Sequence, residues 1–161
     1  SNVSVVMADN PDGLSQLTRA QLGVLRSMYV PIIYQTDYLK VARLLGHADI
    51  IVDALLGYNI LGNPRGNYAD LIKFANASGK KILSIDGPSG LDPDTGQAFI
   101  PCINASHPLC LGLLKKGLSE KGAKQAVGRL YLADIGIPKE VFQLMGLDAG
   151  NIFGKEAIIR V

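Results

Sequence analysis

Short apolar runs alternate with longer amphipathic stretches along most of the chain. The runs are rich in valine and isoleucine and predict strands at 3–7, 31–34, 49–53, 81–85, 106–113 and 128–133. Between several of them, apolar residues recur at the three-to-four-residue spacing of a helix. These stretches predict one helix over 15–28, a second capped by Asp37, and a third capped by Asn67 and ended by Gly79. Such alternation predicts an α/β fold with a mostly parallel sheet.

Two of the predicted strands lead into an aspartate. The runs DIIVD, over 49–53, and KILSI, over 81–85, are typical of strands buried on both faces of a parallel sheet. Asp53 ends the first run, Asp86 directly follows the second, and each precedes a glycine-rich turn. Because ligands bind beyond the carboxyl ends of parallel strands, we expect the two carboxylates side by side at such a site. The alternative is that both only cap strand ends, where aspartate is common.

Composition narrows the class of protein. With 161 residues, 48% of them hydrophobic, the chain is expected to form one domain over 1–161. A net charge of +2, with no run of more than two basic residues, disfavours nucleic-acid binding. No apolar run reaches the roughly 18 residues of a membrane helix, and the N-terminus resembles no secretory signal. We therefore expect no membrane partner and a cytoplasmic location, with an organellar one left open.

Familiar catalytic motifs fail at a required position. Gly57 and Gly62 have the glycine spacing of a phosphate-binding loop, but Asn63-Pro64 stands where that motif needs lysine followed by serine or threonine. Ser89, in GPSGL, lacks the second glycine in register for the nucleophile turn of a hydrolase. A P-loop ATPase and a serine hydrolase are therefore disfavoured.

Four segments together carry a more specific signal. They are DALLGYNILGNPRG (53–66), SIDGPSGLD (84–92), LCLGLLKKGL (109–118) and LADIGIP (132–138). In this order and at this spacing they resemble the YjeF N-terminal domain family, the NAD(P)H-hydrate epimerases. The resemblance runs from about Val3 to Val141. It implies a three-layer Rossmann-like α/β/α sandwich.

The resemblance also implies an activity and a site. Members of the family are isomerases that interconvert the R and S epimers of hydrated NADH and NADPH, a form of metabolite repair. Asp53 and Ser89 match the family's potassium ligands, and their oxygens suit a hard monovalent cation. Asp86 matches a substrate-contacting carboxylate, and we interpret it as the general acid/base at the C6 hydroxyl. The loop that wraps the dinucleotide matches Gly57, Tyr58, Asn59, Ile60, Leu61, Gly62 and Asn63.

One feature of the family is absent from this sequence. The family's first core strand ends in a loop of the form G-x-G-N-N-G-G-D-G, which cradles phosphates, and no such loop is present. The domain is thus expected to lack that strand and to be N-terminally incomplete relative to the family, with the strand supplied by a missing segment or a partner. The resemblance further implies a homodimer and a partner dehydratase. The alternative is a non-catalytic scaffold for nucleotide sensing or dimerisation, which retention of Asp53, Asp86 and Ser89 disfavours.

Overall fold

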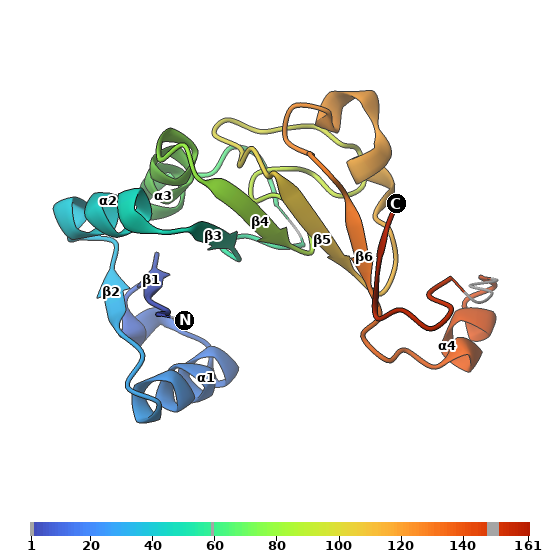
Figure 1. Ribbon diagram of the computed structural model, residues 1–161, viewed down its shortest axis with the longest axis horizontal. Helices are drawn as coiled ribbons and strands as arrows, with labels where there is room; N and C mark the ends of the chain where they lie inside the picture. Colours follow the sequence, from blue (N-terminus) through green and yellow to red (C-terminus); the bar gives the residue numbers. More distant parts are fainter. Residues whose placement is uncertain (1, 59, 148–151) are drawn as a thin grey trace.

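The protein is an α/β structure whose strands form two sheets (Figure 1). The computed structural model describes residues 2–58, 60–147 and 152–161. The smaller sheet pairs β1 with β2 in parallel, and the larger has the order β3-β4-β5-β6-β7, parallel except for β7. The strands are β1 (Val5–Met7), β2 (Ile32–Tyr34), β3 (Ile50–Asp53), β4 (Lys81–Ile85), β5 (His107–Leu111), β6 (Tyr131–Ala133) and β7 (Ile158–Arg160). The predicted α/β fold with a mostly parallel sheet is therefore confirmed.

Helices join the strands in the first half of the chain. The α-helices are α1 (Gln16–Ser27), α2 (Tyr38–His47), α3 (Gly66–Ala77) and α4 (Lys139–Leu144), and the 3-10 helices are η1 (Pro11–Gly13), η2 (Lys116–Ser119) and η3 (Lys121–Ala123). Asp37 caps α2 as predicted, accepting a hydrogen bond from the Lys40 backbone at 3.2 Å. No helix of the described chain is both long and apolar enough to cross a membrane.

Two local predictions were wrong. Asn67 does not cap α3, which begins at Gly66; its side chain instead donates to the carbonyl oxygen of Ala8 at 2.7 Å and ties the end of β1 to this helix. The alternation of strands and helices also ends at β4, because the connections from β4 to β5 and from β5 to β6, both fully described, contain no α-helix. Their glycines and prolines favour tight turns over a continuous helix.

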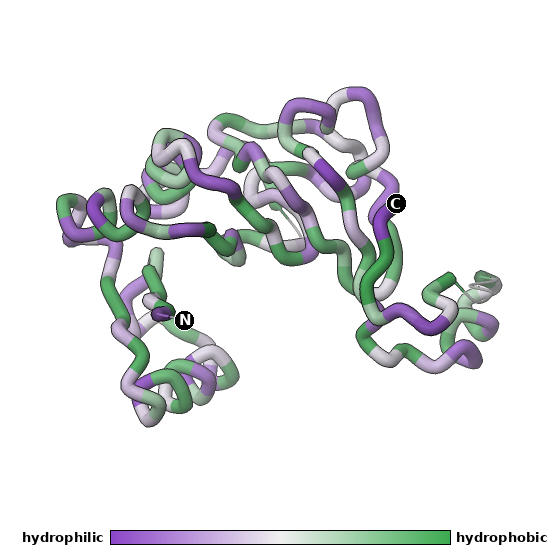
Figure 2. The backbone as a smooth tube through the Cα atoms, in the orientation of Figure 1, coloured by the Kyte–Doolittle hydropathy of each residue, from purple (hydrophilic) through white to green (hydrophobic). Residues whose placement is uncertain are grey.

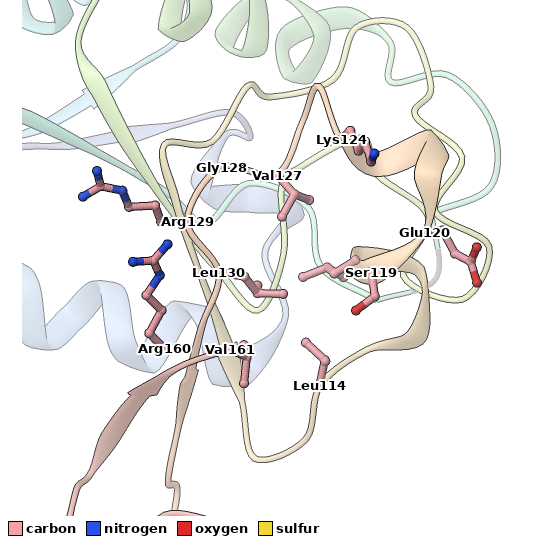
Figure 3. Close-up of a pocket in the computed structure, with 11 residues that line it drawn as sticks. Leu114, Ser119, Glu120, Lys124, Val127, Gly128, Arg129, Leu130, Arg160 and Val161 are labelled. Atoms are coloured by element: carbon pink, nitrogen blue, oxygen red, sulfur yellow. The ribbon is translucent and has the colours of Figure 1, made fainter.

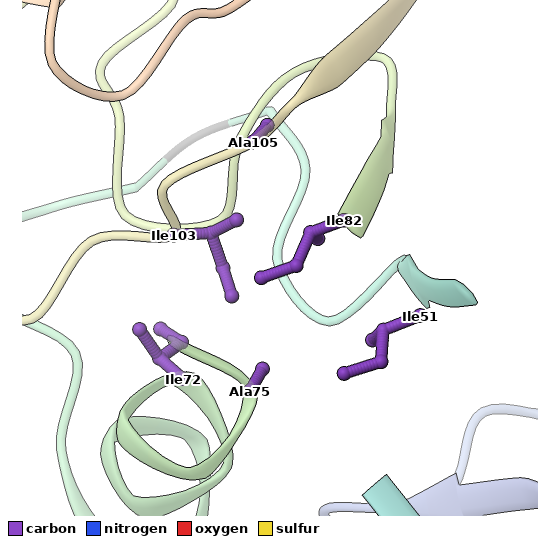
Figure 4. Packing of buried hydrophobic residues seen from close by; sticks show 6 residues of the cluster. All are labelled: Ile51, Ile72, Ala75, Ile82, Ile103 and Ala105. Atoms are coloured by element: carbon purple, nitrogen blue, oxygen red, sulfur yellow. The ribbon is translucent and has the colours of Figure 1, made fainter. Parts of the chain in front are cut away.

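The core lies on one face of the larger sheet. Figure 4 shows Ile51 and Ile82 from the sheet pointing toward Ile72 of α3, together with Ala75, Ile103 and Ala105. A second cluster packs Leu118 and Ala123, from η2 and η3, against Cys110 and Leu132 of the sheet. In Figure 1, α3 and the η2–η3 segment lie above the sheet. All connections between β3 and β6 thus cover the same face.

The opposite face, here the open face, carries apolar side chains without a covering helix. Ile50 and Val52 of β3 are 50% and 58% exposed, and Ile158 of β7 is 52% exposed. In Figure 1, α1 and α4 lie below the two ends of the sheet, and the described chain places no helix beneath β4 and β5. Figure 2 shows hydrophobic positions along these strands. The expectation that β3 is buried on both faces was wrong, since its apolar run meets a core on one side only.

The two sheets are separate pieces of parallel structure. β1 is hydrogen-bonded to β2 alone and β3 to β4 alone within the described chain, so each has a free edge. Side chains of the cluster Ala8, Ile33, Val41 and Leu71 connect the smaller sheet to α2 and α3.

Candidate functional site

Asp53, the last residue of β3, lies buried at the carboxyl end of the sheet. Its side chain is 3% exposed and accepts four hydrogen bonds from the chain. Oδ2 accepts from the Ser84 hydroxyl at 2.8 Å and from the Ser89 backbone at 2.9 Å. Oδ1 accepts from the Ser89 hydroxyl at 2.6 Å and the Leu55 backbone at 3.3 Å. Asp53 therefore holds the loops after β3 and β4 together.

Ser89 completes the link between these loops. Its hydroxyl accepts from the Leu56 backbone N–H at 2.9 Å and lies 3.2 Å from the Leu56 carbonyl oxygen. Ser89 is 1% exposed, so these contacts are shielded from solvent. A carboxylate, a hydroxyl and a carbonyl oxygen thus converge at one buried point. This oxygen set is of the kind that a hard cation binds.

Asp86, directly after β4, has a different setting. It has a backbone φ of 66°, a left-handed conformation that aspartate adopts more readily than most residues. Its N–H donates to the Leu109 carbonyl at 2.8 Å, and its Oδ1 accepts from the Leu111 backbone at 3.1 Å. These bonds fix the carboxylate over the end of β5. The side chain nevertheless remains 33% exposed.

Lys115 forms an ion pair with Asp86. Its ammonium group contacts Oδ1 of that carboxylate and donates to the Leu111 carbonyl at 3.1 Å. The lysine side chain is 25% exposed, so the pair is partly shielded from water. Sequence reasoning did not single out Lys115, although it lies in the segment LCLGLLKKGL. The family segment T-x-x-F-G-x-x-K-x-G-L, which this segment resembles, has its lysine at the position of Lys115, so the resemblance could have separated it from Lys116.

A small cavity of about 20 Å3 opens beside this ion pair, enough for about one water. Its lining includes Asp86, Lys115, Gly57 and Tyr58. Tyr58 is 71% exposed, so the glycine-rich loop borders the cavity from the solvent side. Asp53 is not part of the lining. Asp86 therefore borders this cavity without Asp53.

The rest of the predicted dinucleotide loop lies farther away. Ile60, Leu61, Gly62 and Asn63 are not among the cavity's lining residues. Leu61 is 98% exposed, and the Asn63 side chain accepts from the backbone of Ile100 at 2.9 Å. Asn59 lies outside the described residues. The structure thus joins only the first part of this loop to Asp86.

Two cysteines near the site are reduced and shielded. Burial raises the pKa of the Cys102 thiol to about 12, and the negative charge of Asp53 raises it further. Burial also raises the pKa of the Cys110 thiol, whose Sγ lies 3.9 Å from the Asp86 carbonyl oxygen. Both thiols remain protonated at neutral pH and are therefore poor nucleophiles.

A larger cavity lies elsewhere, with a volume of about 310 Å3. It is lined by the residues that precede β6 and by the end of β7 (Figure 3). Leu130, Val127 and Leu114 form an apolar wall there, whereas the Arg129 and Arg160 side chains point away from it. It contains none of the predicted site residues.

Comparisons with known proteins place this site in a family. The family described as YjeF-related protein N-terminus matches residues 1–117. The chain belongs to this family. An NAD(P)H-hydrate epimerase of Dehalogenimonas lykanthroporepellens is 38% identical over 84% of this chain and 52% of its own length. One from Lentilactobacillus buchneri is 35% identical over 84% of this chain and 60% of its own length.

Longer family members and a solved structure agree with this placement. A bifunctional NAD(P)H-hydrate repair enzyme Nnr of Moorella thermoacetica is 32% identical over 88% of this chain and 27% of its own length. The crystal structure of yeast ynu0 has a TM-score of 0.73 at 19% identity, covering 92% of this chain and 62% of that one. The YjeF-related fold is therefore shown, and this chain spans about half the length of the first epimerase it matches.

Proposed function

We propose that this protein is an NAD(P)H-hydrate epimerase, an isomerase that interconverts the R and S epimers of hydrated NADH and NADPH. The observation that carries the proposal is Asp86, a fixed and partly exposed carboxylate at the cavity beside the glycine-rich loop. Epimerases with 33–38% identity over most of this chain support the same reaction. The substrate is the hydrated dinucleotide.

Asp86 is placed to handle the proton of the reaction. The substrate carries a hydroxyl at C6 of the nicotinamide ring, which must leave and return on the opposite face. The ring nitrogen stabilises the cation that remains when the hydroxyl departs as water. The protein therefore has to orient the ring and move a proton at the C6 oxygen, work that suits a positioned carboxylate.

A potassium ion is proposed at the buried oxygen cluster formed by Asp53, Ser89 and Leu56. The Ser89 hydroxyl lies 2.6 Å from the Asp53 carboxylate and 3.2 Å from the Leu56 carbonyl oxygen, and oxygens of these kinds fit a hard cation. When bound, potassium would supply positive charge that favours the binding of phosphate oxygens. In its absence, hydrogen bonds between Asp53 and Ser89 hold the two loops in place.

A homodimer is proposed on the basis of the open face. Parallel sheets are rarely left uncovered on one side, because both faces carry apolar side chains. Ile50, Val52 and Ile158 contribute exposed apolar area there. We expect sedimentation to report a dimer and Val52→Lys to shift it toward monomer. A monomeric wild type at micromolar concentration would contradict the proposed dimer.

A single assay tests the reaction. One purified epimer of hydrated NADH is mixed with the protein, and the appearance of the other epimer is followed in potassium and then in sodium. We expect acceleration over the spontaneous rate, and a larger rate in potassium. Saturable binding without acceleration would instead support the non-catalytic scaffold. Equal rates in the two salts would contradict the proposed potassium site but not the proposed epimerase activity.

A further inference from the structure

In the ion pair at the cavity, Lys115 rather than Asp86 carries a proton that it is able to donate. Lys115 contacts Oδ1 of Asp86, and the two side chains are 25% and 33% exposed. Aspartate and lysine side chains carry opposite charges at neutral pH, and the contact brings these charges together. The resting pair is therefore carboxylate and ammonium. A carboxylate in this state accepts a proton but has none to give.

Lys115 and Asp86 also differ in the hydrogen bonds that each can still form with a ligand. The Lys115 ammonium has three protons, and its described acceptors are Asp86 Oδ1 and the Leu111 carbonyl oxygen. Asp86 Oδ1 receives both the Leu111 backbone N–H and Lys115, whereas no described donor bonds to Oδ2. One proton of the lysine and one oxygen of the aspartate thus remain for a ligand. Both residues line the same small cavity.

We propose that Lys115 is the proton donor of this site and Asp86 its proton acceptor. The inference rests on the proposed epimerase function and divides between two residues the acid/base role first given to Asp86 alone. Lys115 gives a proton to the C6 hydroxyl as the C6–O bond breaks, its electron pair leaving with water. Water then adds to the other face of the ring, and its surplus proton passes to Asp86.

The contact between the two side chains allows the site to return to its starting protonation state. After one turnover Lys115 is a neutral amine and Asp86 a neutral acid. Transfer of one proton from Asp86 to Lys115, along their hydrogen bond, restores the starting state. No proton, electron or co-reactant is consumed, as an isomerisation requires. A lysine one residue away, the exposed Lys116, lacks this contact among the described residues and serves as a matched control.

The test separates charge from proton donation. Lys115→Arg retains a positive charge beside Asp86, but arginine does not release a proton in proteins. Lys115→Ala removes both, and a small ammonium ion such as methylammonium replaces the donor from solution. We expect Lys115→Arg and Lys115→Ala to lose about 100-fold or more of the wild-type rate. Methylammonium is expected to restore part of the alanine variant's rate, and Lys116→Met to retain full activity. Thermal unfolding of each variant verifies its fold.

Three results would overturn the inference. Lys115→Arg with more than about a third of the wild-type rate would show that charge alone suffices, against the 100-fold loss expected of a proton donor. A folded Lys115→Ala variant without any response to methylammonium would exclude a donor at this position. A wild type that does not accelerate epimerisation would contradict the proposed function itself. An active wild type with an active arginine variant contradicts only the role of Lys115.

Discussion

The aspartates at the ends of β3 and β4 have the same charge and opposite surroundings. Asp53 is 3% exposed and has two hydrogen-bond donors on each carboxylate oxygen. Asp86 is 33% exposed, has a left-handed backbone and is paired with a lysine at a cavity. A buried carboxylate whose oxygens are all hydrogen-bonded holds loops together. A more exposed carboxylate with a free oxygen is able to take part in proton transfer with a ligand. Substitutions at these two aspartates and at their neighbours test this division.

Replacing Asp86 with asparagine is expected to cause the largest loss of activity. The amide still accepts the Leu111 N–H through its oxygen, but it no longer takes up a proton. Epimerisation should slow by about 100- to 10,000-fold, with little change in thermal stability. Asp94→Asn, at an exposed carboxylate in the following turn, is the control. Unchanged turnover in Asp86→Asn would remove this residue from the mechanism.

Replacing Asp53 with alanine is expected to act on stability instead. The change leaves Ser84 and the Ser89 backbone without their buried acceptor. Leaving such groups unpaired should lower the free energy of unfolding by about 3 kcal/mol, measured by urea denaturation. Asp49→Ala, at the exposed start of the same apolar run, should change it by less than about 0.5 kcal/mol. Equal losses in the two variants would contradict a loop-organising role.

Ile51 and Val52 lie on opposite faces of β3, and their replacement should affect stability differently. Ile51 is 8% exposed in the core cluster, and its replacement by alanine should cost about 2–4 kcal/mol of unfolding free energy. Val52 is 58% exposed on the open face. Val52→Ala should cost less than about 1 kcal/mol in dilute protein. A larger, concentration-dependent cost at Val52 would show that a second copy covers this face.

Replacing Cys102 is expected to have the smallest effect, a change in how stability depends on pH. Its pKa is raised from 9.0 to about 12, first by burial and then by the charge of Asp53. Between these values the unfolded thiol ionises while the folded one remains protonated, so stability falls as pH rises. Cys102→Ala should therefore show a shallower fall in urea midpoint between pH 8.5 and 10.5. Identical slopes would show that the thiol is not shielded.

Much of the fold could be predicted from local pattern. Apolar runs located β1 to β6, although not the short β7 at the edge of the larger sheet. Asp37 was identified as a helix cap because its effect is local. Asn67 was misjudged because its partner, the Ala8 carbonyl, lies far away in the chain. The open face of β3 was missed for a related reason. Hydrophobicity shows that a residue is apolar, but not which face of the sheet the connections cover.

The candidate site was predicted only in part. Sequence order placed Asp53 and Asp86 at neighbouring strand ends, but it did not distinguish a buried carboxylate from an exposed one. That difference depends on Ser84 and Ser89, whose donors close around Asp53. Lys115 was missed because its role depends on a contact with a residue 29 positions earlier. Contacts of this kind follow from the folded arrangement rather than from a local motif.

Whether Asp86 serves an epimerase is decided by equilibrating one pure epimer of hydrated NADH in potassium buffer. Wild type, Asp86→Asn and a protein-free sample are followed side by side, with circular dichroism verifying that both proteins are folded. The account predicts rapid formation of the second epimer by the wild type and a rate near the spontaneous one for Asp86→Asn. Wild-type kinetics that match the protein-free sample, or an Asp86→Asn variant as fast as wild type, would contradict it.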